Sequence, residues 1–125
     1  MPPACAGCGR SGALLCDSCV GRLVPPSRAE DRFVAPDAGL VIGDSLALAL
    51  AAFAYAGPMR RALWALKYSG ASRLAPLLAR ASLPALHTLV AVSGAGVLVP
   101  VPVHVQRRRV RGYNQAELIA RELAN

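Results

Sequence analysis

All four cysteines of this 125-residue chain lie in one short stretch, CAGCGRSGALLCDSC, where they form the pairs Cys5/Cys8 and Cys16/Cys19. A two-residue gap lets a tight turn aim both sulfurs at one point, and two such turns build a tetrahedral cage of four thiolates. Four thiolates leave no open coordination position, so a metal held there would be structural. The spacing predicts one zinc ion, with iron, two disulfides or free redox thiols as alternatives.

A second group of chemically active side chains lies in the basic stretch RRRVRGYNQAELIAREL. The chain carries a net charge of +7, unevenly placed: residues 1–59 carry −1 and residues 60–125 carry +8. Such a distribution favours an anionic partner, either a phosphorylated ligand or nucleic acid. Composition alone does not separate the two.

The composition predicts a small module, a linker and a larger domain. Residues 1–23 are too few to bury a sufficient core, so bound metal would supply the folding energy of a zinc ribbon. Residues 24–44 mix proline, glycine and charge and are typical of a linker. Residues 45–125 are left for the larger domain.

No segment has the composition expected of a membrane span or an export signal. Residues 45–59 are uncharged but too short, and prolines and glycines interrupt the uncharged run 81–106. The N-terminus lacks the apolar stretch of a signal peptide. We therefore expect a cytoplasmic protein, whose thiols stay reduced.

The pattern of the larger domain predicts strands followed by helices. Residues 46–57 alternate leucine and alanine, which predicts a strand. Pro58 suits the first turn of a helix closed by Gly70, and a second helix is expected over residues 72–82. Residues 96–103, GVLVPVPV, predict a buried strand whose end is marked by prolines.

The arginines are expected in a loop between that last strand and a helix that begins at about Tyr113. Ligands of α/β proteins bind at the carboxyl ends of strands, and a loop that leads into a helix collects backbone N–H groups. We therefore expect an anion near Gly112 and the N–H groups of Tyr113 and Asn114, held by Arg107 and Arg111.

Three blocks of this sequence, in this order, resemble the ComF family of phosphoribosyltransferase-like proteins, which includes GntX-type members. The blocks are CAGCGRSGALLCDSC, YAGPMRRALWALKYSG and LVPVPVHVQRRRVRGYNQAELIARELA, and the last is the most specific. The resemblance implies an α/β protein in which a zinc ribbon precedes a type I phosphoribosyltransferase fold, a parallel sheet flanked by helices. It also implies a role in DNA uptake or in the use of external DNA, with a DNA-uptake protein as a partner. Single-stranded DNA is the partner expected if the basic half instead binds nucleic acid.

The same resemblance implies a ligand like phosphoribosyl pyrophosphate, bound with Mg²⁺ in the complete family domain. The residues at matching positions are Lys67, Arg107, Arg111, Gly112, Tyr113, Asn114 and Gln115. Asn114 and Gln115 have an alternative role at the start of the helix, with Asn114 as its cap. For the arginines the alternative is a solvated surface loop, and for Lys67 a solvated surface position.

The acid pair and Thr/Gly-rich turn that form the family's phosphoribosyl-pyrophosphate loop are missing, and Thr88 is the one threonine. We therefore expect the front part of the family's chain, without catalytic residues, and self-association through an uncovered strand. The alternatives are a nucleic-acid-binding accessory protein without enzymatic activity and a truncated frame without activity. Tyr55, Trp64 and Tyr68 are expected to be buried or half-buried rather than to stack on bases.

Overall fold

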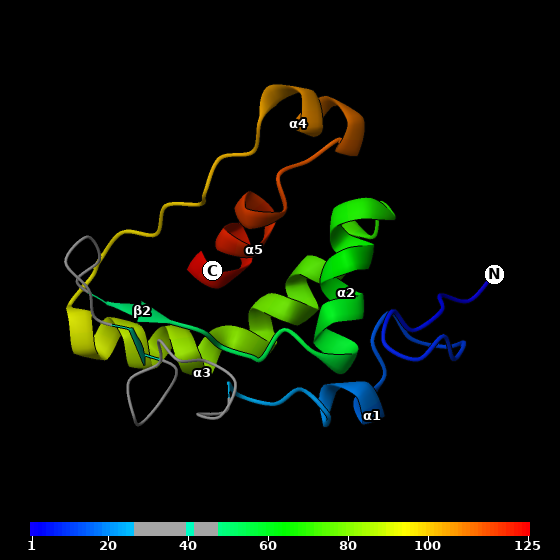
Figure 1. The fold of residues 1–125 in the computed structure, drawn as a ribbon, viewed down its shortest axis with the longest axis horizontal. Helices are drawn as coiled ribbons and strands as arrows, with labels where there is room; N and C mark the ends of the chain where they lie inside the picture. The colour runs from blue at the N-terminus through cyan, green and yellow to red at the C-terminus, as the bar shows by residue number, and fades with distance from the viewer. Residues whose placement is uncertain (27–39, 42–47) are drawn as a thin grey trace.

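The computed structural model describes residues 1–26, 40–41 and 48–125, and its described part is mainly helical (Figure 1). Most of the predicted linker, residues 24–44, lies outside this part of the chain. The elements in chain order are α1 Asp17–Val20, β1 Leu40–Val41, β2 Ala49–Leu50, α2 Gly57–Tyr68, the 3-10 turn η1 Ser72–Leu74, α3 Ala75–Ser93, α4 Val105–Arg111 and α5 Gln115–Ala124.

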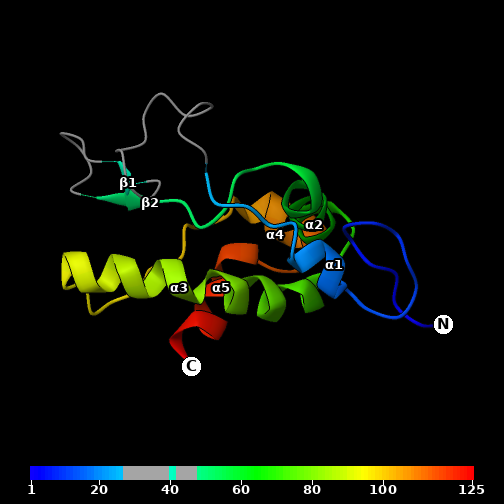
Figure 2. The same cartoon turned by 90° about the horizontal axis from the view of Figure 1, so that it is seen from below.

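The predicted α/β fold is wrong for the residues that the structure describes. Their only strands are β1 and β2, which pair antiparallel with Leu40 opposite Leu50. There is no parallel sheet in the described part and hence no layer of helices covering one. Figure 2 shows the β1–β2 pair at one end of the molecule and the cysteine segment at the other.

Residues 96–103 were predicted to form a buried strand, and this prediction is also wrong. They run as an irregular connection between α3 and α4, and Val97, Val99 and Val101 are 81%, 78% and 74% exposed. A strand exists only with a neighbour to pair with, and Pro100 and Pro102 lack the N–H groups that a ladder needs. The apolar β-branched pattern was therefore not sufficient to form a strand.

The helix predictions fared better. The expected helix after Pro58 is α2, and the expected final helix is α5, whose N-cap is Asn114. The second helix is longer than expected, because α3 continues past Pro84 to Ser93. Pro84 removes one helical hydrogen bond but does not end the helix. The helix ends at Gly94, which lies in the left-handed region at φ 68°.

The arginine stretch is helical, so the predicted loop is wrong as well. Helix α4 begins after His104, whose Nδ1 accepts a hydrogen bond from the N–H of Gln106 at 3.3 Å, and ends at Gly112 with φ 86°. Arginine is a good helix former, and the two caps satisfy both ends of this short helix. The basic side chains therefore project from a helix.

One hydrophobic cluster joins the cysteine segment to the helices. Cys5, Leu15 and Cys19 belong to it, and so do six buried residues of α2, η1 and α3: Met59, Ala62, Leu66, Leu74, Ala75 and Leu78. Helix α5 packs along α3 and adds Leu118 and Ile119. The cysteine segment is thus packed on α2 instead of standing apart from it.

The stretch Ser72–Ser93 is long and apolar enough to cross a membrane, with a mean hydropathy of 1.3. One such helix is weak evidence for a membrane span, because core helices of soluble proteins pass the same test, although only 17% of its apolar window is buried here. The expectation of no membrane span stays a prediction, as does the cytoplasmic location.

Candidate metal centre and candidate anion site

The four cysteine sulfurs lie together, as the spacing predicted. All four Sγ atoms are within 4.8 Å of one another, and the Sγ atoms of Cys8 and Cys16 are 3.7 Å apart. The first turn is closed by the N–H of Gly9, which donates to the carbonyl of Cys5 at 2.7 Å. Helix α1 carries Cys19 back to the same point. The cysteines are positioned to hold a metal ion.

The Cys5 thiol is surrounded by donors that favour its ionised form. The N–H groups of Gly7 and Cys16 each donate to its Sγ at 3.3 Å. Burial raises the pKa of Cys5, but backbone hydrogen bonds from Cys16, Cys8 and Gly7 outweigh burial and lower it to about 6. Cys5 is therefore prepared to act as a thiolate ligand.

Cys19 is in the opposite situation. Burial, with a smaller effect of the neighbouring thiols, raises the pKa of its thiol to about 11, although Arg22 opposes this by donating to its Sγ at 3.1 Å. Four thiolates at this separation repel one another, and a divalent cation removes that repulsion. Arg22 supplies a further positive charge beside the cage, and the same contact raises the pKa of its own guanidinium.

A second candidate site lies where α4 approaches the end of α2. Two hollows of about 480 and 250 Å³ share four lining residues, Lys67, Tyr68, Arg107 and Arg111. The larger also involves Gly70, Gln106 and Val110, and the smaller Pro102, Val103, His104 and Gln115. We call these two hollows together the anion site. The structure thus brings Lys67, Arg107, Arg111 and Gln115 together, although Lys67 is far from the others in the sequence.

Arg111 is held in place at the floor of this site. One Nη of Arg111 donates to Oε1 of Gln115, and its guanidinium carbon lies 5.7 Å from the centre of the Tyr68 ring. Its Nε is buried and has no hydrogen-bond partner within the described chain. A buried donor without a partner is costly.

The other three predicted site residues position the site rather than line it. The N–H of Gly112 donates to the carbonyl of Arg108 at 2.8 Å, so it closes α4 and is not available to an anion. The hydroxyl of Tyr113 donates to the carbonyl of Leu66, which ties the segment between α4 and α5 to α2. Burial raises the pKa of Tyr113, and the positive charge of Arg111 partly opposes this.

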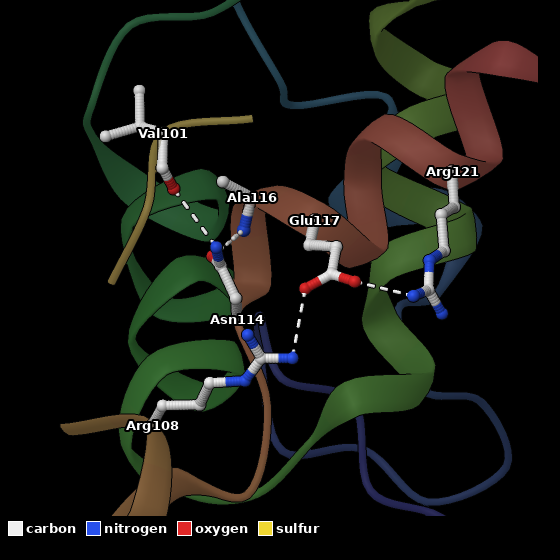
Figure 3. A network of polar contacts seen from close by, with 6 residues as sticks. All are labelled: Val101, Arg108, Asn114, Ala116, Glu117 and Arg121. Atoms are coloured by element: carbon white, nitrogen blue, oxygen red, sulfur yellow. Dashed lines mark hydrogen bonds and ion pairs between the residues drawn. The ribbon is translucent and has the colours of Figure 1, made fainter. Parts of the chain in front are cut away.

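Asn114 is 6% exposed and uses its whole amide inside the fold (Figure 3). Its Oδ1 accepts from the N–H of Ala116 at 3.0 Å, and its Nδ2 donates to the carbonyl of Val101 at 3.1 Å. The side chain therefore caps α5 and anchors the connection before α4. Capping of the helix was one of the two roles expected for Asn114 from the sequence, and ligand contact was the other.

Glu117 joins α4 to α5 through ion pairs (Figure 3). Its carboxylate lies 2.5 Å from Arg121 and 3.4 Å from Arg108. Arg121 lies four residues after Glu117 on α5, and the second ion pair occupies Arg108 of α4. Of the arginines in the basic stretch, Arg107 and Arg111 are the ones that line the anion site.

Sequence reasoning missed the part played by aromatic side chains. Tyr55, Trp64 and Tyr68 were expected to be buried or half-buried, but they are 57%, 52% and 63% exposed. Tyr68 lines the anion site, and its ring centre is 4.7 Å from that of Trp64. The signal was their spacing of four residues on one helix, which places both on the face opposite Met59 and Ala62.

No family model matches this chain, and no match was found among curated proteins or solved structures.

Proposed function

We propose that the chain binds a phosphorylated small ligand, of the phosphoribosyl-pyrophosphate or pyrophosphate kind, at the anion site. The observation that carries this proposal is the convergence of Lys67 with Arg107 and Arg111 around connected hollows. Guanidinium groups bind phosphate oxygens through paired N–H groups, and an ammonium adds a mobile positive charge. A site lined by three cations suits a multiply charged anion.

We further propose that the metal of the cysteine cage is a structural zinc. Four thiolates in a closed cage favour zinc or iron and leave no position for a substrate. The cage shares its hydrophobic cluster with α2, and the last turn of α2 carries Lys67. Zinc would therefore hold one wall of the anion site in place.

The ComF-like assignment remains a proposal, and the residues that carry the resemblance support it. Arg107 and Arg111 line the anion site. Tyr113 is bonded to Leu66 of α2, and Asn114 is bonded to Val101 in the connection before α4. By resemblance, the protein would act in DNA uptake or in the use of external DNA.

Binding without turnover is the activity proposed for this chain. Mg²⁺ would need carboxylates, and residues 45–125 contain only Glu117 and Glu122 as acids. Glu117 is already paired with Arg108 and Arg121. Cleavage of the bond between the ribose and its pyrophosphate group would therefore lack the carboxylates that bind the required Mg²⁺.

A second candidate function, binding of single-stranded nucleic acid, is favoured by one observation. Trp64 and Tyr68 are exposed beside basic side chains, which is the composition of a surface that stacks bases and contacts phosphates. The salt dependence of the affinity separates the two functions. For single-stranded nucleic acid, each phosphate contact contributes about −0.7 to the slope of log affinity against log salt concentration.

The test is a calorimetric titration of the zinc-loaded protein with pyrophosphate, beside the same titration with an oligothymidylate. Arg107→Gln should weaken pyrophosphate binding by about tenfold or more, because a charge-assisted hydrogen bond is lost. Arg73→Gln, an exposed charge outside the anion site, is the matched control and should change it little. Equal loss in both variants would show that only net charge matters and would refute the site.

A further inference from the structure

Trp64 is the only tryptophan of the chain, and it stands half-exposed on α2. Its ring packs on Tyr68 and is not part of the core, and its exposed half is available to a ligand. Its neighbours on the same helix face are Arg60, four residues before it, and Arg61, three residues before it. The first cysteine turn lies at the edge of this face, where Ala6 lines the same hollow as Trp64 and Gly7 accepts a hydrogen bond from Arg61.

A third hollow lies between this face and the first cysteine turn. It has a volume of about 550 Å³ and is lined by Ala6, Gly57, Arg60, Arg61, Trp64, Ala65 and Ser69. It shares no lining residue with the anion site. The two lie along the same helix, because Arg60 and Lys67 are seven residues apart, or about 10 Å of helix.

The side chains around this hollow can donate hydrogen bonds but carry no negative charge. Arg60 and Arg61 offer guanidinium groups, and Ser69 offers a hydroxyl. The Nε of Arg61 donates to the carbonyl of Gly7, which fixes this arginine against the cysteine turn. Among the described residues, no carboxylate forms an ion pair with Arg60 or Arg61. The hollow is therefore suited to an anion.

We propose that this hollow is a second binding site, separate from the anion site, for a flat aromatic anion: an unsaturated ring that carries a phosphate or a carboxylate. The anionic group pairs with Arg60 and Arg61, and the ring stacks on Trp64. An inorganic anion would make no use of the exposed indole, and an uncharged ring would make no use of the two guanidiniums. Ala6 and Ala65 are small, which leaves room for a ring between helix and turn.

The fluorescence of Trp64 reports directly on this hollow, since the chain has no other tryptophan. We would titrate the metal-loaded protein with phenyl phosphate, and in parallel with inorganic phosphate and with benzyl alcohol. Phenyl phosphate should change the emission with saturation, at a concentration at least tenfold below either control compound. Equal responses to phenyl phosphate and inorganic phosphate would overturn the proposal, because the ring would then contribute nothing.

Variants separate the two sites. Arg60→Gln should weaken the phenyl phosphate response about tenfold. It should not disturb the fold, because Arg60 makes no side-chain hydrogen bond within the described residues, whereas Arg61 holds Gly7. Arg107→Gln should leave the response unchanged. If Arg107→Gln removes the response and Arg60→Gln does not, the aromatic anion binds at the anion site and the second site does not exist.

Discussion

Gly7 offers a sharp test of the packing around the metal centre. A Cβ added at this position would lie 2.6 Å from Sγ of Cys19, 2.9 Å from Cβ of Cys19 and 3.2 Å from Cβ of Pro58. The backbone of Gly7 is not in the left-handed region, so alanine is accepted there by the main chain. Any effect of Gly7→Ala therefore comes from the collision with Cys19 and Pro58.

The expected cost follows from these distances. Overpacking a tight site costs about 1–3 kcal/mol, and here the atom displaced is a metal ligand. If that cost falls on the metal-bound state, the affinity for metal decreases by about 5- to 140-fold, at 1.4 kcal/mol for each tenfold. Gly21→Ala is the control, because Gly21 lies in the same segment at φ −64° and its nearest contact would be 3.4 Å.

The assay is a competition for Zn²⁺ between the reduced protein and a coloured chelator, with Co²⁺ absorption as a check on tetrahedral thiolate ligation. Gly7→Ala should lose affinity within the stated range, and Gly21→Ala should bind as the parent does. An unchanged affinity in Gly7→Ala would show that Cys19 does not occupy the cage as the structure places it.

Two further predictions concern the residues that hold α4 and α5. Tyr113→Phe removes a hydrogen bond to Leu66 and should lower the urea midpoint by the equivalent of about 1 kcal/mol, with the slope unchanged. The pKa of Tyr113 is raised in the folded chain, so its contribution to the free energy of unfolding is present below pH ~10 and is lost as the pH rises through the raised pKa. Tyr113→Phe should not lose stability in this pH range. A pH profile identical to that of the parent would contradict the argument. Asn114→Ala removes the cap of α5 and the bond to Val101 and should cost about 1–3 kcal/mol in a thermal melt, whereas a cost near zero would show that the amide is not needed.

The metal cage could be predicted from the sequence because its constraint is local. Two Cys-x-x-Cys turns close over a few residues, and their geometry depends little on the rest of the chain. The helices α2 and α5 were predictable for a similar reason: Pro58 begins one, and Asn114 caps the other. Each of these sequence signals lies within one or two turns of the structure that it determines.

The sheet could not be predicted correctly, because a strand depends on a partner elsewhere in the chain. Residues 96–103 have the β-branched composition of a strand, but the described part offers them no neighbour. Residues 105–111 form a helix because His104 and Gly112 cap its two ends. Neither residue was predicted to be a helix cap. Long-range pairing and an unrecognised cap account for these errors.

The anion site was predicted in part. Lys67, Arg107 and Arg111 were named from the sequence and line the same two hollows. The loop after a strand that was expected to carry Arg107 and Arg111 was wrong, and Lys67 was named only through the family resemblance. What brings them together is the packing of α5 on α3 and the contact of Tyr113 with α2. Neither contact has a signature that can be read along the chain.

The most direct test of the proposed function is an NMR titration of the zinc-loaded protein, labelled with ¹⁵N at arginine, with pyrophosphate. The side chain of Arg111 lines both hollows, so its Nε–H resonance should shift strongly and with saturation as the anion binds. Arg107 should shift along the same binding curve, while Arg73 and Arg80, exposed and away from the hollows, should stay in place. Equal small shifts of all arginines, or none at Arg111, would contradict a phosphate-binding site between α2 and α4.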